Sequence, residues 1–568
     1  MRSWPRAAAN AVGLVALTVA ICSPAGGPAA AATSPAVGSW TVYHGDSYGR
    51  GVAAGVTAVD TSRRAWTSPA VDGQIYGEPL VWAGRIYVAT ENDTVYALSD
   101  RTGAVAWSVH LGNPVPAASL PCGNITPTVG ITGTPVIDQS RNEIFVVADE
   151  DRHGTAAHVL VGLDTSTGRI ETTQDVDPPG AQTTALLQRT GLTLDAGQVV
   201  FGFGGNYGDC ASYQGRVAAV SETGGQPRYF TVDAAAGESQ GAIWMGGAAP
   251  VVDDSGHVWV STGNGSVYSD AHAYDDSDSA LELSSSLRLL QFFAPANWAQ
   301  NNSRDLDMSI APVLLSDGQV LLTGKSRIVY LLSGSHLGGI GGQQASLASG
   351  CGNDIDGGAA IVGMTAYLPC TTGVIAVQVT SSAAGLRVLW SSRAGGGPPV
   401  VAAGLVWTIG QNGVLYGVSL ASGQVRQQAA IGIPANHFST PGVGDGLMLA
   451  ASANRVVAFP AAGPATPGAS TPSTATPGTA PANAASHPPT PTANRAAAST
   501  GALPAGAIAG IIIGFLVVLG AIGWLFRRGW HRRQRLCRSQ ADELIYSAVR
   551  CRDSGGDSTF PVPAALGE

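Results

Sequence analysis

Residues 79–107 read PLVWAGRIYVATENDTVYALSDRTGAVAW, and this stretch decides the fold. Short runs of β-branched and aromatic residues alternate in it with polar turns such as Ala83-Gly84 and Asp100–Gly103. Valine, isoleucine, tyrosine and tryptophan favour strands, whereas Gly, Asn and Asp favour tight turns. The stretch therefore predicts a unit of three to four short antiparallel strands.

The same unit recurs along most of the chain, which makes internal repetition the strongest signal in the sequence. In each copy a proline or small residue opens an apolar run, a Gly, Asp or Asn turn follows, and a short β-branched strand comes next. No credible amphipathic helix separates the copies. The opening runs are Pro79–Thr90, Thr134–Ala148, Leu192–Phe203, Ala249–Ser261, Ala311–Thr323, Ala359–Pro369, Pro399–Ile409 and Pro441–Ser452.

Eight such repeats predict an all-β fold, an eight-bladed β-propeller over residues 33–460, because each blade of a propeller is one small antiparallel sheet. The last repeat ends after RVVAF at Arg455–Phe459, so its outer strand has to come from elsewhere. We expect the segment between Trp40 and Trp66 to supply this strand and to close the ring. A pair of β-sandwiches is the competing architecture, but sandwiches do not repeat one unit eight times.

Both ends of the chain have the composition of export and membrane signals. Residues 1–32 combine Arg2 and Arg6 with an apolar run and a group of small residues, which predicts a signal peptide. Residues 461–503 are rich in Ala, Pro, Thr and Ser and predict an extended stalk. Residues 504–526 carry no charge and are long enough to cross ~30 Å of hydrocarbon as one C-terminal transmembrane helix.

The arginines that follow this apolar segment set the expected orientation. Six of them lie between Arg527 and Arg538, and positively charged flanks of membrane helices remain in the cytoplasm. We therefore expect residues 527–568 to be a cytoplasmic tail. The propeller is expected outside a cell membrane to which the chain is anchored by a single pass.

Charge and cysteine content narrow the function classes. A net charge of −9 with 12% charged residues gives no indication of a basic surface, so no nucleic-acid partner is expected. No C-x-x-C-H motif occurs, so no attached haem is expected. Four cysteines lie in the predicted outer part, where oxidising conditions favour two disulfides. Three pairings are open; the short separation of Cys351 and Cys370 favours that pair and leaves Cys122 with Cys210.

The repeat consists of an apolar strand, Asp or Ser, a Thr-Gly turn and then Trp. It resembles the quinoprotein family, which comprises PQQ-dependent alcohol dehydrogenases and related PQQ-like repeat propellers. The resemblance covers nearly all of the globular part and implies the cofactor PQQ with Ca²⁺ or a lanthanide. Four segments are similar to the family's cofactor site: AIWMGGAAPVV with Trp244, VSTGNGS with Asn264, RDLDMSIAPVLL with Asp305 and Asp307, and LTGKSRIVYLL with Lys325.

The resemblance implies a role for each of these residues. Trp244 matches the tryptophan that forms a flat floor under the quinone, where an electron-poor ring gains by stacking on indole. Asn264 matches the amide ligand of the metal, Asp305 the catalytic aspartate beside that metal, and Asp307 the extra carboxylate of lanthanide-type members. A hard cation prefers such oxygen ligands and polarises a quinone carbonyl. Lys325, the only lysine in the sequence, matches the cation that stabilises the reduced quinone.

The sequence departs from the family in two places. The family's adjacent cysteines are absent, since LPCGNIT contains Cys122 alone. Where the family has a metal-binding glutamate, ADEDRHG has His153, and Glu150 is displaced by a few residues. Two functions therefore stay open: a quinoprotein that oxidises an alcohol or sugar, and a non-catalytic propeller that binds a cell-wall polymer or a protein partner. Convergence of the implied site residues at one end of the central channel would favour the enzyme.

Two further segments carry polar residues without a recognised motif. Asp275, Asp276 and Asp278 form an acidic run that could bind Ca²⁺, although the run lacks the spacing of a known calcium loop. The segment GGNYGDC, which ends at Cys210, is typical of a blade loop fixed by a disulfide.

Overall fold

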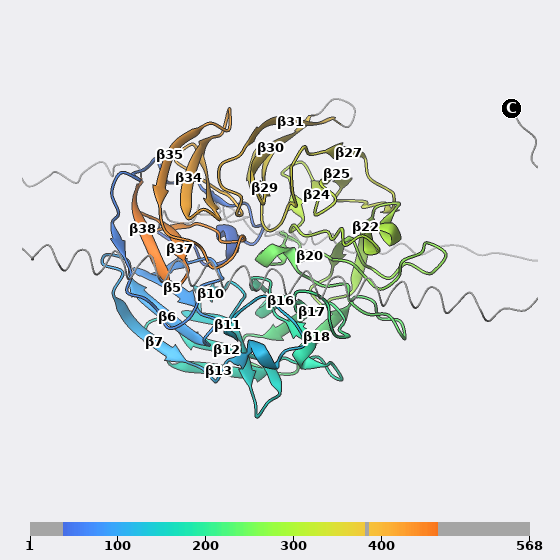
Figure 1. The fold of residues 1–568 in the computed structure, drawn as a ribbon, viewed down its shortest axis with the longest axis horizontal. Coiled ribbons are helices and arrows are strands. Elements are labelled where there is room, and N and C mark those ends of the chain that lie inside the picture. Colours follow the sequence, from blue (N-terminus) through green and yellow to red (C-terminus); the bar gives the residue numbers. More distant parts are fainter. Residues whose placement is uncertain (1–37, 381–384, 464–568) are drawn as a thin grey trace, which may run out of the picture. The chain divides into compact units, whose positions relative to one another are not determined.

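The computed structural model describes residues 38–380 and 385–463. These residues form eight mainly antiparallel sheets, which follow one another around a ring in chain order (Figure 1). The first strand of each sheet lies toward the centre of the ring and the last strand at its rim, as the labels of β10 to β13 show (Figure 1). The predicted eight-bladed β-propeller is therefore confirmed.

The first four blades are built from residues 80–294. Blade 1 contains β4 (Leu80–Trp82), β5 (Arg85–Ala89), β6 (Thr94–Ser99) and β7 (Val105–His110). Blade 2 contains β10 (Val136–Asp138), β11 (Glu143–Asp151), β12 (Ala156–Asp164) and β13 (Ile170–Asp175). Blade 3 contains β14 (Leu186–Leu187), β15 (Thr193–Asp195), β16 (Gln198–Gly205), β17 (Arg216–Ser221) and β18 (Arg228–Thr231). Blade 4 contains β19 (Val251–Val252), β20 (Val258–Ser261), β21 (Ala280–Leu283) and β22 (Leu289–Ala294), joined by the parallel β26 (Gly339–Ile340).

The other four blades complete the ring. Blade 5 contains β23 (Val313–Leu314), β24 (Gln319–Leu322), β25 (Ile328–Ser333) and β27 (Ala345–Ala348). Blade 6 contains β28 (Ala360–Val362), β29 (Thr365–Cys370), β30 (Gly373–Thr380) and β31 (Gly385–Ser392). Blade 7 contains β32 (Val400–Ala402), β33 (Leu405–Gly410), β34 (Val414–Ser419) and β35 (Val425–Ala430), joined by the parallel β1 (Val52–Ala53). Blade 8 contains β36 (Gly442–Gly444), β37 (Leu447–Ser452), β38 (Arg455–Ala462), β2 (Ala58–Val59) and β3 (Trp66–Thr67).

Outside the blades, the described residues form short elements. A two-stranded ladder joins β8 (Val115–Pro116) to β9 (Thr128–Val129). The single α-helix of the described ranges is α1 (Trp298–Asn302). Short 3₁₀ turns are η1 (Tyr43–Gly45), η2 (Ala117–Ser119), η3 (Thr183–Ala185) and η4 (Met245–Gly247).

Blade 8 is completed by the N-terminal segment, as the sequence predicts. Both β2 and β3 pair antiparallel with β38, the last described strand of the chain. This pairing joins the two ends of the propeller within one sheet. The predicted domain boundary at residue 460 is two residues short, because Ala461 and Ala462 remain in β38 opposite Val59 and Ala58.

Residues 40–53 have a second task that the sequence does not reveal. This segment follows the first strands of five blades and forms backbone hydrogen bonds with each, so it lies against the inner wall of the ring. No strand pattern marks it, because its partners are set by the assembled ring and not by a neighbouring strand in sequence. The residues it contacts in this way are Val81, Ile137, Val252, Ile361 and Val401.

Tryptophans on outer strands connect neighbouring blades. The Trp66 indole N–H of β3 donates to the Asp100 carbonyl of blade 1 at 2.6 Å, and that of Trp107 in β7 donates to the Thr165 carbonyl of blade 2 at 3.0 Å. Each ring packs on a turn glycine that has a positive φ, as Trp66 does on Gly103. The Thr-Gly and Trp elements of the repeat are therefore two halves of one contact between blades.

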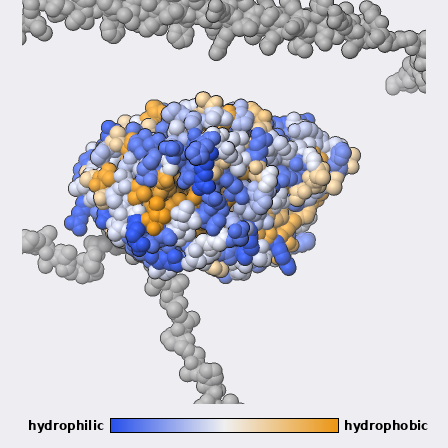
Figure 2. Space-filling model, turned by 90° about the horizontal axis from the view of Figure 1, so that it is seen from below, coloured by the Kyte–Doolittle hydropathy of each residue, from blue (hydrophilic) through white to orange (hydrophobic). Residues whose placement is uncertain are grey.

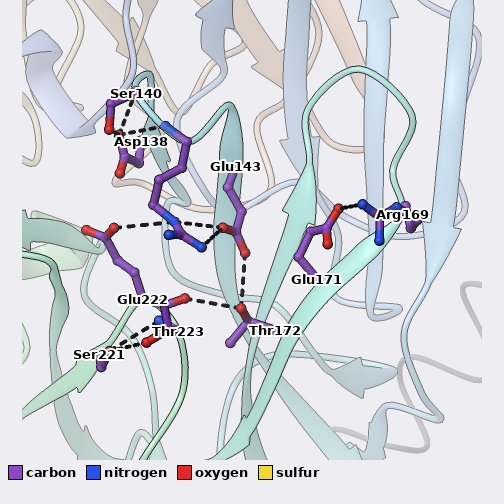
Figure 3. A network of polar contacts seen from close by, with 10 residues as sticks. Asp138, Ser140, Glu143, Arg169, Glu171, Thr172, Ser221, Glu222 and Thr223 are labelled. Atoms are coloured by element: carbon purple, nitrogen blue, oxygen red, sulfur yellow. Dashed lines mark hydrogen bonds and ion pairs between the residues drawn. The ribbon is translucent and has the colours of Figure 1, made fainter.

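The junction between blades 2 and 3 is polar (Figure 3). Arg141 pairs with Glu143 at 2.8 Å and reaches Glu222 of the next blade at 3.6 Å. The Thr172 hydroxyl of blade 2 lies 3.2 Å from the Glu143 carboxylate oxygen Oε1 and 3.1 Å from the backbone carbonyl oxygen of Glu222. One arginine and one threonine thus connect the two blades across their turns.

Both predicted disulfides are present. Cys122 is bonded to Cys210 and Cys351 to Cys370, with Cα–Cα distances of 5.9 and 5.8 Å. Seen from below, the surface is mostly hydrophilic, with hydrophobic residues in separate patches (Figure 2). Residues 38–380 and 385–463 include no helix of the length and apolar character that a membrane span requires. The predicted signal peptide, nearly all of the predicted stalk, the predicted span at 504–526 and the predicted tail lie outside these ranges.

Candidate functional site

The four segments singled out by resemblance come from neighbouring elements of blades 4 and 5. Trp244 directly precedes η4, and Asn264 follows β20. Asp305 and Asp307 lie between α1 and β23, and Lys325 follows β24. Propeller geometry explains their meeting, because loops at equivalent ends of successive blades lie side by side.

Hydrogen bonds join these residues into one cluster. Asp305 Oδ1 accepts from Asn264 Nδ2 at 2.9 Å and from Lys325 Nζ at 2.8 Å. Asp307 Oδ1 accepts from the Asn264 backbone N–H at 2.7 Å, and its Oδ2 pairs with Lys325 Nζ. The lysine ammonium therefore lies between the two carboxylates and balances part of their charge.

A glycine brings the tryptophan to this cluster. A β-carbon on Gly263 would lie 2.5 Å from Asp307 Oδ1 and 3.1 Å from Trp244 Cδ1. Any larger residue at position 263 would push the indole and the carboxylate apart. The glycine in the T-G-N-G turn thus allows Trp244, Asn264 and Asp307 to share one wall.

The charges at this wall are unequally exposed. Asp307 is nearly buried, with 9% of its side chain exposed, whereas 74% of the Asp305 side chain is exposed. Although burial opposes the charged form of Lys325, the carboxylates of Asp307 and Asp305 raise its pKa above the usual value. Lys325 is therefore a permanent cation, and Asp305 is the carboxylate that a bound molecule can reach.

These side chains border a cavity of about 860 Å³. The cavity is lined by Trp244, Asp305, Asp307 and Lys325. Asn264 adjoins the cavity through its hydrogen bond to Asp305. This volume is in the range of pockets that hold small organic ligands. The structure thus brings together all five residues that the sequence singled out.

Arg189 is a site residue that the resemblance did not indicate. It lines the cavity, is only 8% exposed, and places its guanidinium 4.5 Å from the centre of the Phe438 ring. Among the described residues the guanidinium forms no hydrogen bond or ion pair. The carboxylates of Glu91 and Asp356 act on it from a distance, but its N–H groups remain available to an anionic ligand group. No motif surrounds Arg189, so only the fold reveals it.

The Cys122–Cys210 disulfide lies at the same cavity. Its two sulfur atoms would lie 3.5 Å from a β-carbon on Gly208, which lines the cavity together with Tyr207 and Asp209. The family's adjacent cysteine pair is absent from the sequence, but a disulfide between distant cysteines holds the GGNYGDC loop at the cavity wall. Asp209, whose carboxylate accepts from the Tyr213 hydroxyl at 2.7 Å, adds a carboxylate there.

His153, near the position of the family's metal-binding glutamate, and Glu150, displaced from it by a few residues, are not at the cavity. Glu150 packs on Gly112 and pairs with Arg152 at 3.2 Å, while His153 is exposed in the turn between β11 and β12. Neither lines the cavity. The departure noted in the sequence is therefore real, and Asp209 is the carboxylate that lies nearer to the cluster.

A separate group of potential metal ligands lies on blade 4. Asp253, His257 and Glu282 place one ligand atom each within 4.8 Å of one another. In the structure His257 Nδ1 is hydrogen-bonded to Glu282 Oε1 at 2.6 Å, and Asp253 Oδ2 accepts from the Trp259 indole at 3.0 Å. One ligand atom of each residue is thus already engaged in a hydrogen bond, and none of the three lines the cavity.

Residues 29–140 and 52–333 match a family model of PQQ-like repeats, described as "Outer membrane protein assembly factor BamB". Taken together, the matched residues exceed half of the chain. The chain belongs to this family. This assignment to the PQQ-like family confirms the resemblance found in the strand, turn and tryptophan repeat. No curated protein sequence matches the chain.

Solved structures with a similar fold include three dehydrogenases. The quinohemoprotein alcohol dehydrogenase ADHIIG from Pseudomonas putida HK5 is 12% identical, with 76% of this chain and 81% of that chain covered at a TM-score of 0.58. The quinohemoprotein alcohol dehydrogenase from Comamonas testosteroni is 13% identical, with 74% and 80% covered at a TM-score of 0.56. A europium-containing methanol dehydrogenase is 14% identical, with 73% and 89% covered at a TM-score of 0.54. At these identities, the similarity to the three dehydrogenases shows a shared fold only.

Proposed function

We propose that the chain is a quinoprotein oxidoreductase that binds PQQ with Ca²⁺ or a lanthanide in this cavity and oxidises an alcohol or sugar. One observation carries the proposal. Four residues that lie up to 81 positions apart in separate segments meet at one wall: Trp244, Asn264, Asp305 and Lys325. Propeller geometry brings such loops together, and the residue types that meet here, an indole, an amide, carboxylates and an ammonium, are those that a quinone and a hard cation need.

The residues present fit the cofactor and its metal. Asn264 Oδ1 is buried and accepts no hydrogen bond in the described ranges, as expected of an oxygen kept for a cation. The carboxylates of Asp305 and Asp307 would complete its anionic ligands. The indole of Trp244 offers a stacking face, and Arg189 and Lys325 offer cations for the carboxylates and oxygens of the quinone.

The chain's own residues would divide the remaining work. PQQ would supply the two-electron redox chemistry. Asp305 would take the hydroxyl proton of the substrate at Oδ2, because Oδ1 is already held by Asn264 and Lys325. Lys325 Nζ would hold Asp305 Oδ1 in place at 2.8 Å and would stabilise negative charge on a reduced ligand.

Turnover by the full-length chain tests the proposal. The protein is supplied with PQQ and either Ca²⁺ or a lanthanide, and reduction of a dye acceptor is followed with a panel of alcohols and sugars. We expect Asp305→Asn to lower kcat by about 10²-fold or more, the range of a lost general base. Asp317→Asn, an exposed carboxylate in the β23–β24 turn, is the matched control. Equal turnover by the two variants would refute the role of Asp305.

A non-catalytic binding propeller is the second candidate. Two observations favour it: Glu150 and His153 are absent from the cavity, and Asn264, Asp305, Asp307 and Lys325 already bond to one another. Such a closed cluster could serve to hold loops for a cell-wall polymer or a protein partner. Binding of such a partner by a folded chain that fails to bind PQQ would select this function.

The setting in the cell is also a proposal. The predicted signal peptide, stalk and apolar segment 504–526 support a cell-surface propeller with a single-pass anchor. Protease added to intact cells is expected to release the propeller and to leave the tail uncut. Cleavage of the tail with protection of the propeller would reverse the orientation.

A further inference from the structure

Two carboxylates lie buried against each other between blades 3 and 4, away from the residues that line the cavity. Asp233 follows β18 at the end of blade 3, and Asp275 lies in the loop between β20 and β21 of blade 4. Asp233 is 0% exposed and Asp275 is 4% exposed. The Asp233 backbone N–H donates to the Asp275 carbonyl at 3.1 Å, which fixes the two residues side by side.

The free oxygens of this pair face one glycine. A β-carbon on Gly265 would lie 2.5 Å from Asp275 Oδ2 and 2.9 Å from Asp233 Oδ1. Among the described residues no N–H or hydroxyl group donates to either Asp233 oxygen or to Asp275 Oδ2, so these oxygens have only each other within hydrogen-bonding reach. A buried carboxylate that accepts nothing loses the whole of its hydration without compensation.

No cation within the described ranges offsets these charges. The charged groups that act on Asp233 are Asp275, Glu238 and Asp276, all of them carboxylates. Two arrangements can hold such a pair together: a proton shared between the carboxyls, or a metal ion bound between them. Burial, and after it the charge of Asp275, raises the pKa of Asp233 to about 10, so the pair without a metal would retain one proton.

We infer that Asp233 Oδ1 and Asp275 Oδ2 bind a divalent cation of the Ca²⁺ class. Both ligand groups of the pair are carboxylates, and neither is an imidazole or a thiolate. Oxygen ligands of this kind favour a hard cation. The additional negative charge of Glu238 and Asp276 attracts it. With only two carboxylate side chains as direct ligands, we expect a Kd of about 10⁻⁴–10⁻³ M, the range of extracellular calcium modules.

A cation at this site would also hold the loop that carries Asn264 against blade 3. Gly265 adjoins Asn264, and the Asn264 carbonyl accepts from the Gly241 N–H at 2.7 Å. Asp275 belongs to the same loop, which returns to the cluster near Asp278. A cation that joins Asp233 to Asp275 therefore ties this loop to blade 3. It is a structural site, and it does not depend on the proposed quinone chemistry.

Thermal unfolding of the full-length chain with increasing CaCl₂ tests the inference. Wild type is expected to show a saturable rise in Tm, which Asp233→Asn and Asp275→Asn each abolish. Asp270→Asn, an exposed carboxylate of the same loop, is expected to keep the rise. Asp305→Asn/Asp307→Asn is also expected to keep it, which separates this site from the cavity.

Three outcomes would overturn the inference. The first is the absence of a Ca²⁺-dependent rise in wild type, which leaves the shared proton as the arrangement of the pair. The second is a full rise in both Asp233→Asn and Asp275→Asn, which places the bound ion elsewhere. If either variant fails to fold, equilibrium dialysis against radioactive Ca²⁺ counts the bound ions directly. It is carried out on wild type, on Asp270→Asn and on the cavity variant Asp305→Asn/Asp307→Asn. The third outcome that would overturn the inference is the absence of a bound ion in this cavity variant.

Discussion

At the scale of single residues, Lys325 links fold and chemistry. It is the only lysine in the sequence, and its ammonium contacts both Asp305 and the nearly buried Asp307. Removing one partner of a buried ion pair leaves an uncompensated charge, which costs about 3 kcal/mol or more. We therefore expect Lys325→Gln to lower the free energy of unfolding by about that amount in urea denaturation. Lys325→Gln/Asp307→Asn should regain most of the loss; if it does not, the pair is not the cause.

His44 gives the fold a pH dependence of predictable sign. It is 1% exposed, and its Nδ1 lies 3.2 Å from the Ala359 carbonyl. Burial lowers the pKa of His44 from 6.5 to about 4, although the backbone carbonyls oppose the shift. Between these values the unfolded chain binds a proton that the folded chain does not, so stability falls as pH drops from about 6.5 to about 4.

A variant isolates this contribution from other groups, such as Glu78, whose carboxylate accepts from the His44 backbone N–H. His44→Asn suits the site, because His44 has a φ of 59° and asparagine tolerates this conformation. The stability difference between wild type and variant is expected to shrink by on the order of 3 kcal/mol from pH 7 to pH 4. A constant difference across that range would contradict the assignment.

At the scale of elements, the ring closes through a strand and a tryptophan. Gly103 has a φ of 68°, and a β-carbon there would overlap the Trp66 ring. Gly404 has a φ of 70° and has no atom within 4 Å of that position. Gly404→Ala should cost about 1–2 kcal/mol for backbone strain alone, and Gly103→Ala about 1–3 kcal/mol more because the indole has to move. Equal losses in chemical denaturation would show that Trp66 does not press on the turn.

The sequence predicts the blades well because each strand pair is local. Seven of the eight opening runs cover all or most of the first two strands of a blade, the run of blade 3 covers β15 and most of β16, and the N-terminal segment supplies the outer strands of blade 8. Residues 40–53 escape prediction because their hydrogen-bond partners, such as Val81 and Val401, exist as a surface only after the ring has formed. Composition alone places Ala461 and Ala462 in the stalk, because composition does not register their pairing with β2.

At the scale of the whole molecule, the propeller assembles a cavity from loops of different blades. The sequence could indicate Trp244, Asn264, Asp305, Asp307 and Lys325, because each lies in a segment that resembles the family's site. Arg189 and Asp209 escaped prediction, because their segments carry no such pattern and only the fold brings them to the cavity. The membership in the PQQ-like family settles the architecture, while the chemistry depends on what this cavity binds.

Direct titration of the full-length chain with PQQ is the decisive measurement. With Ca²⁺ or a lanthanide present, we expect saturable quenching of tryptophan fluorescence at one PQQ per chain. Trp244→Ala is expected to weaken this binding by about tenfold or more, since stacking on indole is worth about 0.5–1.5 kcal/mol beyond the contact area that is also lost. Trp82→Ala, which lies in blade 1 and does not line the cavity, is the matched control. Absence of PQQ binding with every metal tested, by a chain whose circular dichroism shows a folded propeller, would contradict the account.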